Sequence, residues 1–502
     1  MRASFVFGRA VLAVALLIGF YALALGIALG LFWVPYAELV YGHRITPKLA
    51  FVCIVGGGAI LWSVLPRPDR FRAPGPQLKP ETYPRLFEEL GVVAQATGQA
   101  MPSEVYLVPD VNAWVTQRGG IMGFGSRRVM GLGLPLMRIL TRSQFRAVLA
   151  HEFGHYYGGD TKIGPWIYKT RAAIGRTLHA LADRSWLQAP FRWYGSMFLR
   201  ITHAVSRRQE FVADGLAART VGARPLIEGL CCVHKVAPAF HDYWRRECGP
   251  VFSAGFLPPL ADGFGQFVKA AHIAEGMDKY LEDHLARGEA DPYDTHPSLR
   301  ERIAAVERLP QGSDLPEDPP AVSLLQDVPT LERQLMAQLA GPDEAAKLTP
   351  IVWGEVGSRV YFPHWARLVQ LNAASLSGVT PESLSKVAAD PKSFGKGLVD
   401  LSKQAPGDET AEALAIGVAG AALNLLLIER GGRLDVTPGH DISVKLGGYD
   451  VKPFGVLPAL KDGTMPAHTW EAQCAELGIA GADLGAVAAS ALDGTGLKSA
   501  GA

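Results

Sequence analysis

The chain has 502 residues, with 49 basic and 48 acidic side chains and a formal net charge of +1. This length exceeds that of one ordinary domain and predicts two or three. The balanced charge argues against a broad nucleic-acid-binding face, so no nucleic-acid partner is expected. Hydrophobic residues make up 48% of the chain and the mean hydropathy is +0.13, which favours a few membrane spans attached to globular domains. Five scattered cysteines without a CxxC pair argue against a disulfide framework or a thiolate zinc site.

Two uncharged runs near the N-terminus predict membrane spans. Residues 11–34 form a run of 24 residues, which reaches roughly 36 Å as a helix and exceeds a hydrocarbon core of about 30 Å. Residues 49–65 form a run of 17 residues, at the lower limit for a span. A cleaved signal peptide is the alternative for the first run, with Ala22-Leu23-Ala24 as the cleavage site, but the apolar run continues well beyond that point.

The charges that flank these runs predict their orientation. Five arginines precede the first run or follow the second, whereas the short loop between the runs carries two basic residues. The outer five are Arg2, Arg9, Arg67, Arg70 and Arg72, and the loop has Arg44 and Lys48. Basic residues favour the cytoplasmic side, so residues 1–72 are predicted to be a transmembrane hairpin with both ends in the cytoplasm. We expect an integral, multi-pass protein of a bacterial cytoplasmic membrane, with its larger part facing the cytoplasm.

The segment after a proline- and arginine-rich linker at 66–80 reads as a compact unit of helices and short strands. A helix is predicted over 83–99, and another begins at Thr141, which has the capping-box spacing with Gln144. Short strands are predicted at 104–108, 113–117 and 129–132. Residues 166–208 predict amphipathic helices, either in an ordinary helical core or at a membrane surface.

Residues 309–321 contain four prolines with acidic and small residues and predict a linker. Residues 322–502 then form a predicted separate α/β domain of unknown role. It contains an alanine-rich helical stretch at 411–429 and strand-like runs at 441–446 and 449–457.

The string His151-Glu-Phe-Gly-His155 contains the residue types of a catalytic metal site. Histidines four apart on a helix lie on one face and converge on one point, which suits Zn²⁺. Glu152 flanks that point and can exchange protons with a zinc-bound water. With 13 histidines in the chain, HExxH arises by chance roughly once in fifty such sequences. Two surface or core histidines are the alternative, but the apolar approach at 145–150 indicates a buried helix, in which imidazoles need partners.

A catalytic zinc usually takes three protein ligands. Glu210 in Glu210-Phe-Val-Ala-Asp214 can supply the third, and Asp214, one helical turn later, can hold the far N–H of a histidine ligand. By itself an ExxxD pattern is typical of a solvated helix face. After HExxH it favours a metal site.

These two motifs resemble the M48 family of membrane-associated zinc metallopeptidases, which includes the CAAX prenyl endopeptidases and the HtpX peptidases. The likeness extends over residues 81–308. It implies an α+β fold: a mainly helical, gluzincin-type zinc metallopeptidase domain with a small antiparallel sheet. It also implies one Zn²⁺ per chain held by His151, His155 and Glu210, with Glu152 as general base and Asp214 orienting a ligand histidine.

The same resemblance suggests weaker site candidates. Asn112-Ala113-Trp114 is similar to the strand that holds the substrate backbone in the family, although a plain core strand fits equally well. His296, in a His-Pro element, is a candidate oxyanion stabiliser or a structural histidine. Asp160 is a candidate support for the metal site. The chain departs from the family in having only an N-terminal hairpin, so prenyl-peptide cleavage and HtpX-type quality control do not carry over directly.

The sequence therefore predicts a membrane-anchored metalloendopeptidase whose partners are a polypeptide substrate and the lipid bilayer. Misfolded membrane or cytoplasmic proteins are the expected substrates, by family analogy. One alternative is a non-catalytic membrane scaffold that displays the C-terminal domain. Another is a peptidase in which residues 322–502 inhibit the enzyme or bind a partner protein.

Overall fold

The computed structural model describes most of the chain. The described residues are 2–65, 69, 71–120, 125–156, 164–181, 185–287, 297–312, 317–402 and 410–487. The chain divides into two compact units. The first comprises Met1–Pro238 and Gly276–Gly341, and the second comprises Ala239–Glu275 and Pro342–Ala502.

This division differs from the predicted boundary, because part of the expected peptidase segment groups with the C-terminal residues. Strand β5 (Phe256–Leu257) pairs in parallel with β6 (Thr349–Pro350). The ring of Tyr243 packs against Trp353, with centroids 6.2 Å apart. These are contacts between segments distant in sequence, which local composition does not reveal.

The first unit begins with two apolar helices, α1 (Arg2–Gly42) and α2 (Pro47–Val64). Their segments Val14–Gly42 and Pro47–Val64 are long and apolar enough to cross a membrane. The predicted spans lie in these helices, and large apolar side chains such as Trp62 remain exposed on them.

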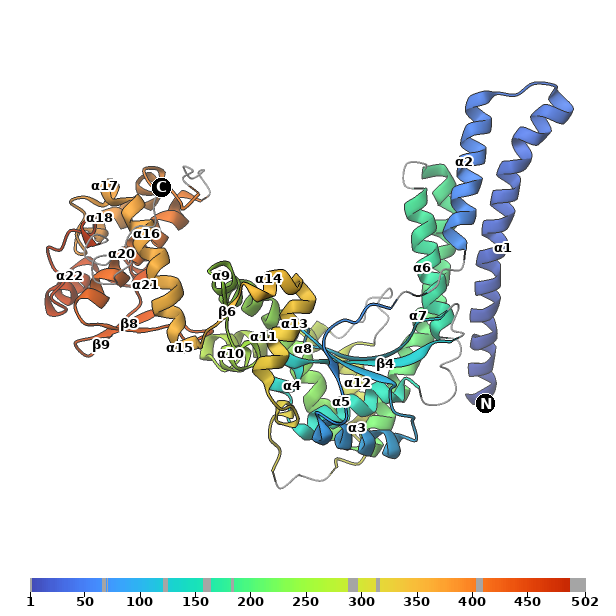
Figure 1. Cartoon of the computed structure of the whole chain (residues 1–502), viewed down its shortest axis with the longest axis horizontal. Coiled ribbons are helices and arrows are strands. Elements are labelled where there is room, and N and C mark those ends of the chain that lie inside the picture. Colours follow the sequence, from blue (N-terminus) through green and yellow to red (C-terminus); the bar gives the residue numbers. More distant parts are fainter. Residues whose placement is uncertain are drawn as a thin grey trace. The chain divides into compact units, whose positions relative to one another are not determined.

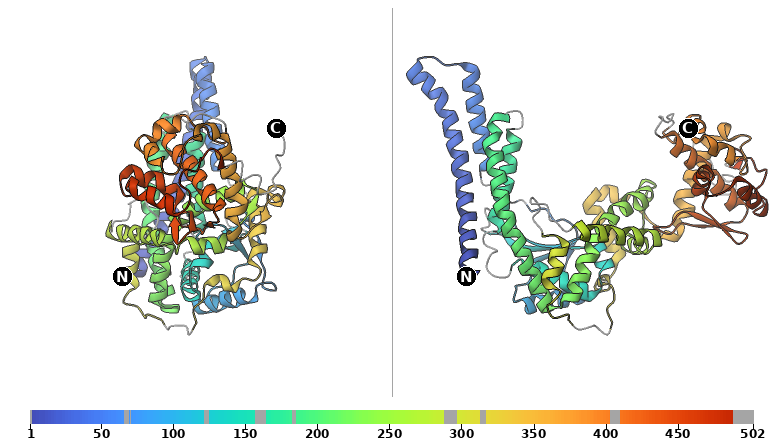
Figure 2. Two further views of the ribbon diagram at one scale, coloured as in Figure 1. Left: turned by 90° about the vertical axis from the view of Figure 1, so that its left-hand side faces the viewer. Right: turned by 180° about the vertical axis from the view of Figure 1, so that it is seen from behind.

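Helices α6 (Gly164–Ala180) and α7 (Ser185–Thr220) pack along α1 and α2 (Figure 1). The same arrangement is visible from behind in Figure 2. Their shared core contains buried aromatic and aliphatic side chains of all four helices, among them Phe20, Ile60, Ile174, Phe191 and Phe198. A hydrogen bond of 2.8 Å between the Ser63 and Thr177 hydroxyls fixes α6 against α2. The predicted helices in 166–208 are thus present, and α7 extends further, to the segment that carries Glu210.

The sheet of this unit has the strand order β1-β2-β4-β3. Its strands are β1 (Gln77–Leu78), β2 (Glu104–Val108), β3 (Ala113–Arg118) and β4 (Arg127–Gly133). The prediction of an antiparallel sheet is wrong for one pair, because β4 inserts between β2 and β3 and runs parallel to β2. As a consequence β3 lies at an edge of the sheet, with β4 as its neighbour.

Helix α5 (Arg142–Gly154) carries the HExxH string and is anchored at both ends. At its start Thr141 and Gln144 form the predicted capping box. At its end α5 crosses α7 so closely that a Cβ on Gly154 would lie 2.7 Å from the Cα of Ala213. A glycine at this position therefore sets the distance between the helix of the histidines and the helix of Glu210.

Other helices complete the first unit. Helix α12 begins with a capping box between Ser298 and Glu301. The set comprises α3 (Pro84–Thr97), α4 (Leu134–Ile139), α8 (Ala223–Tyr243), α11 (Ala271–Arg287), α12 (Leu299–Val306), η3 (Ala321–Leu324) and α13 (Val328–Ala340), of which α8 and α11 continue into the second unit.

The second unit is built around α20 (Ala411–Glu429), whose apolar side chains form its core. This helix is also long and apolar enough to span a membrane, but 67% of its apolar stretch is buried inside the protein. The helices of this unit are η2 (Trp244–Cys248), α9 (Gly249–Ser253), α10 (Leu260–Phe267), α14 (Pro342–Ala346), α15 (Trp353–Val356), η4 (Gly357–Tyr361), α16 (Phe362–Leu371), α17 (Ala373–Leu376), α18 (Leu384–Ala389), α19 (Pro391–Lys396), α20, α21 (Pro453–Asp462) and α22 (Ala467–Glu476).

A three-stranded antiparallel sheet, β7 (Arg433–Asp435), β8 (Ser443–Leu446) and β9 (Tyr449–Val451), accompanies α20. The predicted strand over 449–457 ends at Val451, and residues 453–457 belong to α21. Pro453 explains the difference, since proline lacks the N–H of a strand ladder but fits the first turn of a helix.

Candidate metal centre

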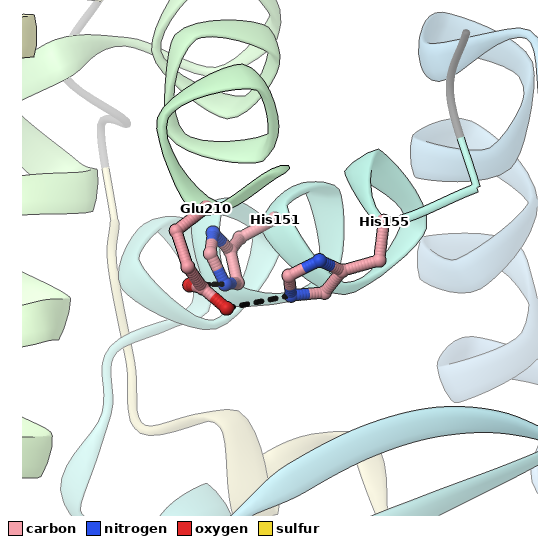
Figure 3. Close-up of side chains that lie close together, drawn as sticks. All are labelled: His151, His155 and Glu210. Carbon is pink, nitrogen blue, oxygen red and sulfur yellow. Dashed lines mark ion pairs between the residues drawn. The ribbon is translucent and has the colours of Figure 1, made fainter. Parts of the chain in front are cut away.

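Three side chains from two helices converge in the first unit (Figure 3). Helix α5 contributes His151 and His155, whose rings lie 4.7 Å apart and 80° from parallel. Helix α7 contributes Glu210, which is buried. One nitrogen of each imidazole and one oxygen of the carboxylate all lie within 4.8 Å of one another. The structure thus brings together the three residues that the sequence suggested as metal ligands.

The separations between these atoms suit a small tetrahedral ion. Nε2 of His151 lies 3.4 Å from Oε2 of Glu210, and Nε2 of His155 lies 3.7 Å from Oε1. Ligand atoms placed 2.0–2.2 Å from one ion at tetrahedral angles are roughly 3.4 Å apart. Two imidazole nitrogens and one carboxylate oxygen also form a donor set that zinc accepts. The residues present therefore fit a bound zinc ion.

Asp214 lies one helical turn after Glu210 and contacts the opposite side of the His151 ring. Its Oδ1 is 2.9 Å from Nδ1 of His151, and the carboxylate is fully buried. With Nδ1 held by this carboxylate, Nε2 of His151 is directed toward Glu210. This is the arrangement in which a carboxylate fixes the tautomer and orientation of a ligand histidine.

Arg302 on α12 is a member of the cluster that sequence reasoning missed. Its Nε donates to Oδ2 of Asp214 at 2.8 Å and its Nη2 donates to Oδ1 at 2.7 Å. The same Nη2 lies 3.7 Å from Oε2 of Glu210. One readable signal was the spacing of Leu299, Arg302 and Val306, which puts a charged residue on the buried face of a helix.

The electrostatic environment of this cluster shifts the pKa values of His151 and His155 in opposite directions. Burial alone lowers the pKa of His151, but hydrogen bonds with Asp214 and Glu210 outweigh it and raise that pKa to about 9. Burial and the nearby His151 lower the pKa of His155 to about 4. His155 is therefore neutral and can bind a metal without losing a proton. His151 must release a proton when it binds a metal.

Glu152 lies beside the cluster in the same cavity. Burial is the main cause that raises its pKa to about 7, and the neighbouring Glu210 carboxylate adds to it. The backbone N–H of Val115 on β3 donates a hydrogen bond to this carboxylate. A cation held by the three neighbouring side chains would add positive charge and pull the pKa of Glu152 back down.

The cavity that contains these residues has a volume of about 330 Å³. Asn112, Ala113 and Trp114, at the start of edge strand β3, line it together with the cluster. The two candidate substrate-binding residues therefore border the same space as the histidines. Asp160 and His296 lie outside the described residues, so their suggested roles remain predictions.

Two histidines one helical turn apart and a glutamate from a second helix are the ligand set of zinc peptidases of the His₂Glu type. Residues 80–309 match the family described as Peptidase family M48. Over this segment, which is slightly less than half of the chain, the sequence is similar to family M48, and the relatives that it matches are named HtpX proteases.

Several curated relatives bear the name Protease HtpX. The protein of Serratia proteamaculans is 28% identical over 181 residues, which cover 31% of this chain and 59% of the relative. That of Acinetobacter baylyi is 24% identical over 315 residues, covering 57% of this chain and 93% of the relative. A Protease HtpX homolog of Paracidovorax citrulli is 24% identical over 310 residues, covering 56% and 93%. No solved structure matches the chain.

Proposed function

We propose that the protein is a membrane-anchored, zinc-dependent endopeptidase that hydrolyses peptide bonds. The observation that carries this proposal is the convergence of His151, His155 and Glu210 within 4.8 Å, beside Glu152. The relatives named as proteases support it. A scaffold without catalysis would not need a buried, preorganised ligand set next to an open cavity.

In this proposal His151, His155 and Glu210 hold one Zn²⁺. When bound, zinc supplies a Lewis acid that polarises the scissile carbonyl and lowers the pKa of water. Asp214 orients His151, and Arg302 neutralises the Asp214 carboxylate, so that the buried acidic groups do not repel one another.

The proposed role of Glu152 is proton transfer. Its carboxylate accepts the proton of the attacking water and then gives it to the departing amine. Burial raises the pKa of this group to about 7 in the absence of a metal, and a bound cation would lower it, so that the carboxylate is ionised at neutral pH and can accept the proton. Asn112 and Ala113, at the point where edge strand β3 begins, line the cavity, and an extended substrate backbone can add to that strand.

The proposed setting is a bacterial cytoplasmic membrane, with α1 and α2 as the anchor and the metal site on the cytoplasmic side. The apolar length of the two helices and the excess of arginine at the two ends of the hairpin over its loop support this topology. A reporter fused after Arg72 tests it, because cytoplasmic reporter activity is expected and periplasmic activity would reverse the orientation. Misfolded membrane or cytoplasmic proteins are the proposed substrates.

The activity is tested with the full chain purified in detergent. We expect about one zinc ion per chain and cleavage of casein, a loosely folded substrate. Glu152→Gln should keep the zinc and lose most of the cleavage, because removing a general base costs about 10²–10⁴-fold. Glu88→Gln, a change at an exposed glutamate of α3, is the matched control and should cleave like the wild type.

A zinc-loaded wild type that cleaves no faster than Glu152→Gln would contradict the proposal. It would instead favour the scaffold, provided that the same holds after residues 342–502 are removed to relieve any inhibition. Absence of zinc in a folded protein, together with activity that chelators leave intact, would contradict the metal assignment alone.

A further inference from the structure

A groove of about 470 Å³ lies within the second unit and shares no residue with the candidate metal centre. Part of its lining is the continuous segment 432–437, which contains strand β7. The rest comes from helices α10, α15, η4, α16 and α20. We call this space the β7 groove. The proposed peptidase function does not account for it.

The β7 groove follows the edge of β7 rather than one face of the sheet. Successive side chains of a strand point to opposite faces, yet Arg433, Leu434 and Asp435 all line the groove. In the strand order β7-β8-β9, β7 has β8 as its neighbour on one side and no further strand of the described residues on the other. Residues of both faces border one space where that space runs along the strand edge.

The register of the sheet shows which backbone groups of β7 point to this edge. Strands β8 and β9 are joined by the two glycines 447–448, which both have positive φ, and Leu446 forms the pair that flanks this turn. Flanking residues of a two-residue turn exchange hydrogen bonds, and the bonding direction alternates along each strand. Lys445 therefore bonds toward its β7 partner Arg433, and Leu434 directs its N–H and C=O away from β8. Within the described part of the chain, these two groups form no hydrogen bond outside the sheet.

The protein itself holds the lining of the β7 groove in place. Nε1 of Trp353 donates to a backbone carbonyl at 3.0 Å. A Cβ on Gly357 would lie 2.7 Å from Cδ2 of Leu434, so η4 packs directly against β7. Beyond β7, the N–H of Gly439 donates to Oε1 of Glu247 on η2 at 3.1 Å. Both η2 and η4 are π-helical turns, a form that occurs often at functional sites. The groove is therefore preorganised.

The two faces that meet at this edge differ in polarity. On the core side, Leu434 and Phe362 pack against the hydrophobic core but remain half-buried where they line the groove. On the other face Lys445 forms an ion pair of 3.4 Å with Asp435, which neutralises that carboxylate. Arg433 is exposed and, among the described residues, has no ion-pair partner. The edge thus combines an apolar side with a positive charge.

We propose that the β7 groove binds an extended segment of a partner protein, which adds to β7 as a fourth strand of the sheet. The backbone of this segment bonds to the N–H and C=O of Leu434, and main-chain bonds of this kind supply affinity. Side chains of the added strand alternate between the two faces. The one opposite Leu434 is apolar, and its neighbour opposite Arg433 is acidic. The partner therefore carries an extended segment in which an apolar residue stands next to Asp or Glu.

Peptide binding tests this site. The full chain with Glu152→Gln, which protects the probe from cleavage, is purified in detergent and titrated with the labelled peptide Thr-Val-Glu-Val-Thr-Val-Thr. Fluorescence polarisation measures the dissociation constant, and we expect saturable binding. The same peptide with N-methyl groups on its central residues keeps its side chains but loses its N–H donors, and should bind at least tenfold more weakly. A peptide with Lys in place of Glu should bind up to about fivefold more weakly.

Two variants, made in the same protein, link binding to the β7 groove. Gly354 is exposed and lines the groove, and a Cβ there meets nothing within 4 Å. Gly354→Phe should therefore fold, fill the groove and weaken binding at least tenfold. Gly455→Phe, at an exposed glycine of α21 outside the groove, is the matched control. Arg433→Glu should reverse the order of the Glu and Lys peptides, whereas Lys392→Glu, at an exposed position of α19, should keep it.

Absence of saturable binding, or equal affinities of the peptide and its N-methylated form, would overturn the added strand. It would show instead that β7 is an edge protected by its short length and its charges. Equal binding by Gly354→Phe and Gly455→Phe would place the peptide elsewhere and overturn the groove as its site. A chain that dimerises in light scattering, and no longer does so with Gly354→Phe, would show that a second copy occupies the groove and overturn the proposed partner. Binding is measured without catalysis, so failure of this site is distinguishable from failure of the proposed peptidase function.

Discussion

Arg302 and Asp214 form a two-point ion pair inside the protein, with N–O distances of 2.8 and 2.7 Å and with Asp214 fully buried. Asp214 in turn contacts His151. Helix α12 is therefore connected to the candidate metal centre although it supplies none of the three candidate ligands.

Removal of this arginine should destabilise the first unit and weaken metal binding. Arg302→Ala leaves the Asp214 carboxylate buried without its main counter-charge, which costs about 3–5 kcal/mol. Thermal unfolding in detergent and zinc titration measure the two effects. Arg300→Ala, at an exposed position of the same helix, should leave both unchanged. Equal behaviour of the two variants would show that the ion pair contributes nothing.

Asp214→Asn should reduce zinc affinity while the fold is retained. The amide keeps the size of the carboxylate but loses its charge, and the supporting partner of a histidine ligand typically contributes 10–100-fold to metal affinity. Competition with a chelator of known affinity measures the change. Asp283→Asn, at an exposed position of α11, is the control and should bind zinc like the wild type.

Gly154→Ala should widen the crossing of α5 and α7. The added methyl group would lie 2.7 Å from the Cα of Ala213, so the helices must separate and Glu210 must move away from the histidines. We expect a loss of about 1–3 kcal/mol in stability and weaker zinc binding. Gly91→Ala in α3 meets nothing within 4 Å and should instead stabilise by roughly 0.5–1 kcal/mol. An unchanged zinc affinity in Gly154→Ala would refute the spacing role.

Glu89 should make stability depend on pH. Burial raises the pKa of this carboxyl group, but its hydrogen bonds and charge interactions with Arg146 and Arg142 prevail and lower the pKa below the ordinary 4.5. A lowered folded-state pKa gives stability that is present above about pH 4.5 and is lost as the pH falls through the folded value.

Thermal unfolding of the wild type and of Glu89→Gln between pH 7 and pH 3.5 checks this dependence. The variant should be less stable by about 2 kcal/mol at pH 7, and the difference should shrink toward low pH. A difference that stays constant across this range would contradict the ion-pair explanation.

Local patterns predicted the parts of the site that lie on single helices. The spacing of His151 and His155 fixes their common face, and the spacing of Glu210 and Asp214 does the same for α7. Arg302 joins the cluster through a long-range contact, and no local period reports which distant carboxylate a buried arginine will meet. The parallel pairing of β2 with β4 was missed for the same reason, because strand order depends on tertiary packing.

Helix α7 links the apolar helix α1 to the candidate metal centre. Near one end the hydroxyl of Tyr194 donates to the carbonyl of Leu16 on α1, and sixteen residues later, about 24 Å along the axis, the same helix carries Glu210. If α1 tilts to match a thinner bilayer, α7 should move with it as a rigid helix. The Glu210 carboxylate would then shift relative to the imidazoles of His151 and His155. Zinc affinity in vesicles should then vary with lipid acyl-chain length. A constant affinity would mean that α7 does not transmit the tilt of α1 to Glu210.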